Sequence, residues 1–272
     1  MLIIIKQVSQ RDNGSKKPFN QGFSLLEIII ALAIIGFLSF GVAKTIETTR
    51  DFDKYQENKT YLDSVHNAFL TYVQVNGFLP CPDTDGNGLE NRAVVAPFNC
   101  IAPNGNVPYQ ELGIAEFDVW GQPLFYAVNR QANNPVAIVD NAQSASYFNN
   151  QAVPLPFFTL NTPPTAVANT PALGNAGNYV ICAESEQVTC HATTNVLNTL
   201  EQDAIAVVIS FGKNGRNAVS PTEIENVDND DFFWQASGSN VDHQAFDDQL
   251  FWLTGYDVKY AVIKSGGIIS QQ

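Results

Sequence analysis

The feature that most limits the fold is a long apolar segment near the N-terminus, running from Phe23 to Ala43. As a helix, its 21 residues would cross the roughly 30 Å of hydrocarbon in a bilayer. Glu27 lies inside this segment, although an ionisable side chain costs roughly 2.5–3.5 kcal/mol at the centre of a membrane helix. We therefore expect the Glu27 carboxylate to have a specific partner and a function of its own.

Charge is distributed unevenly along the chain. Residues 1–22 carry four basic side chains and one acidic one, a net +3, so the remainder carries −16 within a total of −13. A basic segment before an apolar run is typically retained on the cytoplasmic side of a membrane. No small-x-small cleavage site follows the run, so we expect the segment to remain as an anchor. The acidic remainder argues against binding to nucleic acid.

Gly22, Phe23 and Glu27 stand in the pattern GFSLLE, which the apolar run continues. This pattern resembles the N-terminal signal of type IV prepilins and of the pseudopilins of type II secretion. The resemblance implies that a prepilin peptidase removes the leader, residues 1–22, by cutting after Gly22, and methylates the new terminus at Phe23. It also implies that Glu27 neutralises the Phe23 ammonium and sets the register of filament assembly. The alternative, a plain single-pass anchor, leaves Glu27 unexplained.

The resemblance also implies a function and a location. The function is that of a filament-forming subunit of a type II secretion or type IV pilus machine. Its partners would be prepilin peptidase, other pilin or pseudopilin subunits and an inner-membrane assembly platform. The precursor would cross the inner membrane once, with its N-terminus cytoplasmic and its C-terminal domain periplasmic, and would join a periplasmic or surface filament. An alternative is a pilus-tip adhesin or receptor-binding minor pilin.

The sequence contains no motif for a nucleophile elbow, a zinc protease or a phosphate loop, so we expect no enzymatic activity. The expected fold class is α+β and pilin-like, with one long N-terminal helix on an antiparallel sheet. The helix would be transmembrane over residues 23–43 and amphipathic over residues 44–77. Its apolar positions recur at helical spacing, and Gly77 and Pro80 predict its end. These positions are Leu62, Val65, Phe69 and Val73.

The globular domain is expected over residues 78–272. Short apolar runs separated by Gly, Asn and Pro predict its strands; they cover residues 123–129, 178–182 and 204–211. Residues 131–176 predict a long loop. Near the C-terminus, a strand through Trp252 should lead into a helix that the Thr254/Asp257 pair opens and Gly266 closes.

The segment FDVWGQPLFYAV, around Asp118 and Gly121, resembles a segment of major pseudopilins. Val119 and Gln122 depart from the family pattern. The residues themselves predict a turn in which Asp118 accepts hydrogen bonds from backbone amides and Gly121 supplies a permissive backbone. This turn would lead into a strand.

The four cysteines are even in number, and an exported domain favours disulfides. Four cysteines allow three pairings. We expect the local pairing, Cys81 with Cys100 and Cys182 with Cys190, because the segments around the second pair flank a polar stretch as a hairpin would. Zinc is the weaker alternative, since the chain has no Cys-x-x-Cys pair.

Alternating oxygen-bearing side chains in PDTDGNGLEN predict a calcium site. Asp83, Asp85 and Asn87 would supply side-chain oxygens, and Leu89 would supply its carbonyl. Val94 stands where a calcium loop has its bidentate glutamate, so Glu90 or a distant carboxylate would have to complete the site. The alternative is a turn leading out of the helix. The acidic segments 228–231 and 246–248 are solvated loops in one interpretation and cation ligands in another.

Overall fold

The structure is a computed structural model that describes residues 24–95, 98, 100–128, 146–149, 151, 156, 158–160, 179–183, 190, 199–218, 220–228, 231–235 and 246–270. The chain divides into two compact units, residues 1–50 and residues 51–272. Most of the segment predicted as a long loop, residues 131–176, lies outside the described residues.

One helix, α1 (Leu25–Asn76), runs through both units and contains 52 residues. It ends where predicted, because Gly77 adopts a left-handed conformation with φ of 79° and its N–H bonds to the carbonyl of Val73. In the first unit, large apolar side chains from Leu25 to Phe40 are exposed, with exposed fractions of 49–84%. Among the described residues, no helix includes a stretch apolar and long enough to count as a membrane span. The predicted crossing by residues 23–43 therefore stays a prediction.

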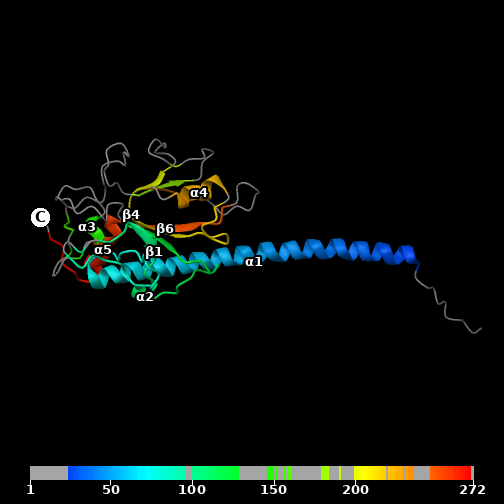
Figure 1. The fold of residues 1–272 in the computed structure, drawn as a ribbon, viewed down its shortest axis with the longest axis horizontal. Coiled ribbons are helices and arrows are strands. Elements are labelled where there is room, and N and C mark those ends of the chain that lie inside the picture. Colours follow the sequence, from blue (N-terminus) through cyan, green and yellow to red (C-terminus); the bar gives the residue numbers. More distant parts are fainter. Residues whose placement is uncertain are drawn as a thin grey trace, which may run out of the picture. The chain divides into compact units, whose positions relative to one another are not determined.

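Six strands in the described part of the second unit form one sheet (Figure 1). Along the main path their order is β1-β2-β4-β3-β5, and β6 also pairs with β4. The bounds are β1 (Asn104–Asn106), β2 (Phe125–Val128), β3 (Tyr179–Ala183), β4 (Thr199–Ser210), β5 (Phe232–Gln235) and β6 (Gln249–Thr254). The predicted runs correspond to β2, β3, β4 and β6, whereas β1 and β5 were not predicted.

The sheet is mixed, so the prediction of an antiparallel sheet is wrong for one pair. β3 and β5 are parallel, with Val180 opposite Phe232 and Cys182 opposite Trp234, while the other pairs are antiparallel. Parallel neighbours need a long connection between them. Here that connection contains β4 and the helix α4 (Pro221–Val227).

Two further helices begin with capping boxes, in which a hydroxyl and a carboxylate satisfy backbone N–H groups. Ser220 and Glu223 form the box of α4, and Thr254 and Asp257 form the predicted box of α5 (Gly255–Lys264). Gly266, with φ of 82°, lies just after α5. The described residues also include two short helices, α2 (Tyr109–Leu112) and α3 (Ser146–Asn149).

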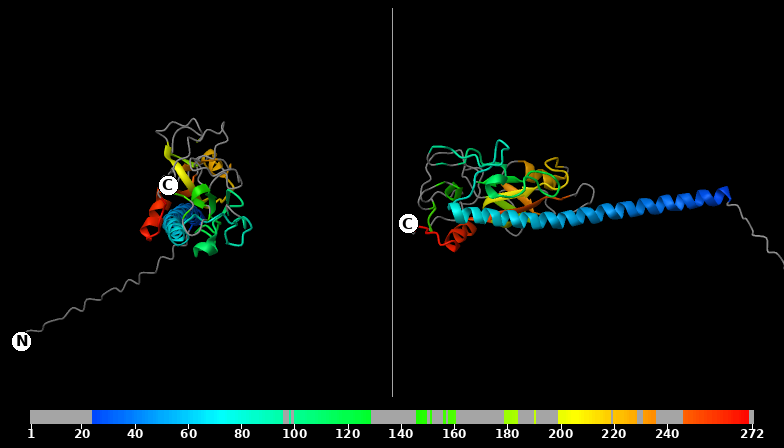
Figure 2. Two further views of the ribbon diagram at one scale, coloured as in Figure 1. Left: turned by 90° about the vertical axis from the view of Figure 1, so that its left-hand side faces the viewer. Right: turned by 90° about the horizontal axis from the view of Figure 1, so that it is seen from below.

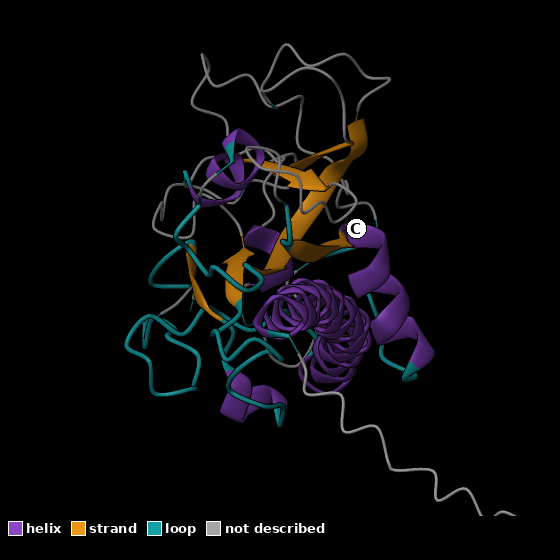
Figure 3. Cartoon of the chain, turned by 90° about the vertical axis from the view of Figure 1, so that its right-hand side faces the viewer, coloured by secondary structure: helices purple, strands orange, loops and turns teal. Residues whose placement is uncertain are grey.

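Apolar side chains from β2 alternate between two core clusters, and β4 contributes side chains to both. One cluster takes Tyr126 from β2 together with the predicted positions of α1 and the buried side of α5. Its members from the two helices are Leu62, Val65, Phe69, Val73, Val258, Ala261 and Val262. The second half of α1 and α5 lie against the same side of the sheet (Figures 2 and 3). The other cluster takes Phe125 from β2 and contains Phe233 from β5.

A buried polar network ties α1 to the sheet through Asn58, which is fully buried. The Asn58 amide donates to Ser210 Oγ at 2.8 Å and to Gln249 Oε1 at 2.6 Å. Ser210 in turn donates to Asp118 Oδ2 at 2.6 Å. Gln249 donates to the carbonyl of Tyr55, so the network contacts α1 at two places one turn apart.

Asp118 also organises the predicted turn before β2. Its Oδ1 accepts the backbone N–H groups of Trp120 and Gln122, both at 2.9 Å. Gly121 has φ of 81°, which confirms the need for a glycine there.

We expect Asn58→Ala to lower the free energy of unfolding of the full chain by about 2–3 kcal/mol, because Ser210 and Gln249 would lose a buried partner. Urea denaturation followed by tryptophan fluorescence measures this loss. Asn67→Ala is the matched control, since Asn67 is exposed on the same helix and its side-chain amide donates to the carbonyl of Asp63 one turn earlier. Equal stability of the two variants would contradict a structural role for the network.

Candidate functional site

The N-terminal site begins at Ser24, the first residue that the structure describes. Ser24 Oγ accepts the N–H of Leu26 at 3.3 Å, and the Ser24 N–H donates to Glu27 Oε2 at 3.3 Å. The first helical hydrogen bond of α1 runs from the N–H of Ile28 to the carbonyl of Ser24 at 3.2 Å. The bond from the Ser24 N–H to Glu27 is one half of a capping box, whereas the Ser24 hydroxyl accepts from Leu26, the second helical residue, and not from Glu27.

Sequence reasoning identified Glu27 but missed Ser24. The structure places Glu27 in the first turn of α1, where a carboxylate is favoured by the helix dipole. The predicted cleavage and methylation residues, Gly22 and Phe23, lie outside the described residues. The signal for Ser24 was present in the sequence, because a serine three residues before a glutamate and an apolar run is typical of a helix start.

The predicted calcium loop has a different set of contacts. Asp83 is buried, with 1% of its surface exposed. Its Oδ1 accepts the N–H groups of Asp85 at 3.1 Å and Gly86 at 2.7 Å, and its Oδ2 accepts that of Gly88 at 2.7 Å. Both oxygens of Asp83 thus organise the backbone of the loop. Gly88 must be glycine here, since it has φ of 80° and an added Cβ would lie 2.6 Å from the ring of Tyr109.

The other predicted ligands also have local partners. Asp85 accepts from the backbone and side chain of Asn87, and Asn87 accepts from the N–H of Leu89. Glu90 forms an ion pair with Arg92 at 2.8 Å and accepts the N–H of Cys81. These contacts support the alternative interpretation of the segment as a turn, and calcium binding there stays a prediction.

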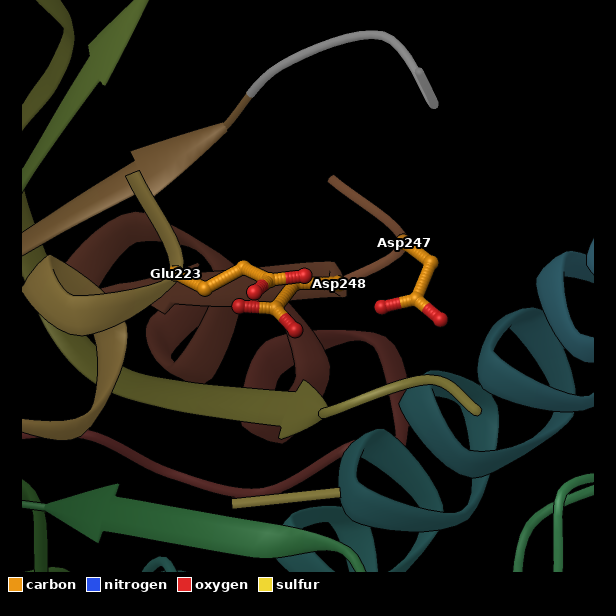
Figure 4. Close-up of side chains that lie close together, drawn as sticks. All are labelled: Glu223, Asp247 and Asp248. Atoms are coloured by element: carbon orange, nitrogen blue, oxygen red, sulfur yellow. The ribbon is translucent and has the colours of Figure 1, made fainter. Parts of the chain in front are cut away.

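Three carboxylates gather elsewhere, between α4 and the segment leading into β6 (Figure 4). Glu223, Asp247 and Asp248 each offer an oxygen, and these oxygens lie within 4.8 Å of one another. Asp247 and Asp248 belong to one of the acidic segments singled out from the sequence. Glu223 was missed, because it lies more than 20 positions before the other two carboxylates and no short pattern connects them. Such a set of oxygen donors could bind a hard divalent cation.

The electrostatics of this cluster follow from its burial. Burial raises the pKa of Asp248 to about 8, opposed by the amide of Asn226 and reinforced by the charges of Asp247 and Glu223. Burial likewise raises the pKa of Asp247 to about 6. The charged forms are therefore disfavoured unless a cation compensates them.

Both disulfides have the pairing expected from the sequence. Cys81 bonds to Cys100, with Cα atoms 5.1 Å apart, and Cys182 bonds to Cys190, with Cα atoms 5.9 Å apart. All four cysteines are buried. The first disulfide closes the loop that contains Asp83 and Arg92.

Comparison with known proteins identifies the N-terminal segment. Residues 18–43 match the family model described as the prokaryotic N-terminal methylation motif. This is the signal of type IV pilins and pseudopilins, so the resemblance drawn from Gly22, Phe23 and Glu27 is confirmed. Neither the curated proteins nor the solved structures include a significant match to the chain.

We expect Asp83→Ala to destabilise the domain by about 2–4 kcal/mol, because three backbone N–H groups lose their acceptor. Asp85→Ala is the control, since Asp85 is exposed and should lose less than about 1 kcal/mol. Urea denaturation in EDTA and in millimolar calcium measures both. A calcium-dependent stabilisation of the wild type that both substitutions abolish would instead favour the calcium interpretation.

The raised pKa of Asp248 predicts how stability depends on pH. Between its ordinary pKa of 3.8 and its folded pKa of about 8, Asp248 holds a proton in the folded protein that the unfolded chain has released. The stabilisation of the fold by this proton is fully present below the ordinary pKa and is lost as the pH rises through about 8. We expect Asp248→Asn to remove most of the loss of stability between about pH 6.5 and 8. Thermal melts in EDTA measure it, with Asp63→Asn, an exposed carboxylate on α1, as the control. An unchanged pH dependence would contradict the assignment.

Proposed function

We propose that this chain is the precursor of a filament subunit in a type II secretion or type IV pilus machine. Prepilin peptidase removes residues 1–22 and methylates Phe23, and the mature subunit is anchored in the inner membrane by the first half of α1. The globular domain lies in the periplasm before assembly. The role is structural rather than catalytic.

The observation that carries this proposal is the match of residues 18–43 to the methylation motif. Two features of the described residues support it. The apolar side chains from Leu25 to Phe40 are exposed along α1 and need a covering of lipid or of other helices. Glu27 lies in the first turn, one turn beyond the position where cleavage would create the Phe23 ammonium.

The second unit supports a mechanical role. The Asn58 network and the apolar contacts from Leu62 to Val73 bind the second half of α1 to the sheet. The ion pair between Lys213 and Asp51, at 2.9 Å, adds a contact near the start of this half. A force that acts on the helix in the membrane would reach the domain through these contacts.

The test is co-expression of the full chain with a prepilin peptidase. We expect the protein to shorten by the 22-residue leader only when active peptidase is present. Gly22→Ala should block the cut by adding a methyl group beside the scissile bond. Gly36→Ala is the matched control, because it adds a methyl group to the same apolar segment at a position with nothing within 4 Å. Cleavage of Gly22→Ala at the wild-type rate, or leader loss without peptidase, would contradict the proposal.

A further inference from the structure

We propose that the exposed face of α5 in one copy of this chain docks into a groove beside α1 in the next copy. This inference rests on the proposed function and names a contact between the globular domains of neighbouring subunits. It starts from two surfaces on the outside of the second unit, a groove and a stripe of apolar side chains.

The groove runs between the second half of α1 and the segment 111–115, and its volume is about 640 Å³. The α1 side of the groove carries short side chains at helical spacing, namely those of Ser64, Ala68, Thr71 and Val75. The segment on the other side ends at Ala115, whose carbonyl accepts a hydrogen bond from Tyr61 Oη at 2.8 Å. Because helices approach each other more closely where the side chains between them are short, this groove suits a second helix.

The stripe is the outer face of α5. Tyr256, Tyr260 and Ile263 are 64%, 65% and 52% exposed, although the opposite face of the helix lies in the core. Their spacing of four and three residues places them on one side of the helix. Apolar side chains at this spacing are the anchors with which a helix enters an apolar groove. The stripe spans about 10 Å and the groove about 22 Å along α1, at 1.5 Å per residue, so the stripe fits lengthwise.

The charges of the two surfaces are complementary. Glu111 lines the groove, Asp63 and Glu116 are exposed next to lining residues, and none of the described residues that line the groove is basic. The stripe ends at Lys264, which is exposed. The acidic residue of α5, Asp257, is engaged in the capping box at the start of the helix. A stripe with a lysine at its end therefore matches a groove with acidic edges.

The position of the two surfaces identifies the occupant as another copy. The helices α5 and α2 lie on opposite sides of the second half of α1 (Figures 2 and 3). A chain therefore cannot place its own α5 in its own groove. Since the two surfaces differ, the contact is heterologous and can repeat along a filament. Packed membrane helices would hold the copies at a high effective concentration, so the contact needs little affinity of its own.

The experiment introduces cysteines into the full chain, in cells that make it naturally. All four native cysteines are in disulfides, so a short bismaleimide reacts only with the new thiols. Thr71→Cys lies in the groove and Ile263→Cys lies on the stripe. We expect chains with both substitutions to give a ladder of dimers, trimers and larger species, because each copy offers both surfaces. A mixture of the two single variants should stop at the dimer, and each single variant alone should stay monomeric.

Two substitutions at Tyr260 in the double-cysteine chain test the chemistry of the contact. Tyr260→Phe keeps the ring and should keep the ladder. Tyr260→Asp brings a negative charge to the acidic groove and should lower the yield of cross-linked species about tenfold, the equivalent of losing one aromatic anchor. The matched control replaces Thr71→Cys by Asn217→Cys, at an exposed position outside the groove, and should give no ladder.

Each other outcome overturns the inference. Cross-linking of Ile263→Cys alone would mean that two α5 helices face each other and close a dimer. A ladder that survives Tyr260→Asp would mean that the stripe does not enter the groove. A Thr71→Cys thiol that reacts only with a different protein would assign the groove to that partner. No ladder, in cells where the wild type loses its leader and enters filaments, would refute the docking alone, whereas a wild type that keeps its leader would refute the proposed function.

Discussion

The buried amide of Asn58 is the interaction on which the position of the long helix depends. Apolar contacts along α1 are non-directional, so by themselves they would tolerate a rotation or a small slide of the helix on the sheet. The Asn58 bonds to Ser210 and Gln249 are directional, so a slide or a rotation of the helix would break them. Because an unsatisfied buried amide costs roughly 1–3 kcal/mol, other registers are penalised. The same network reaches Asp118, so the helix, the sheet and the turn before β2 are fixed together.

Local signals made much of this fold predictable. The end of α1 followed from Gly77 and Pro80, since a left-handed glycine and a proline both stop a helix. The Asp118 turn followed from residues that act within five positions of one another. The Thr254/Asp257 box at α5 is equally local. In each case the residues that decide the structure are close in sequence.

Long-range arrangements could not be predicted in this way. The parallel pairing of β3 with β5 depends on where α4 returns the chain to the sheet, and no short pattern encodes that choice. The cluster of Glu223 with Asp247 and Asp248 joins residues more than 20 positions apart. The spacing of Asp83 predicted a cation loop, but it did not reveal that both oxygens of this carboxylate bond to the backbone of the loop. A pattern of oxygen-bearing residues does not reveal which groups already satisfy them.

The N-terminal processing signal leads into the same long helix whose second half packs on the sheet of the globular domain. We propose that the mature chain begins at Phe23 and keeps its apolar helix. Mass spectrometry of the N-terminal peptide, from protein extracted from the membranes of cells that make it naturally, tests this claim directly. We predict a peptide that begins at Phe23 and carries one N-terminal methyl group. A mature chain that begins near residue 43, or an intact leader in cells with active prepilin peptidase, would contradict it.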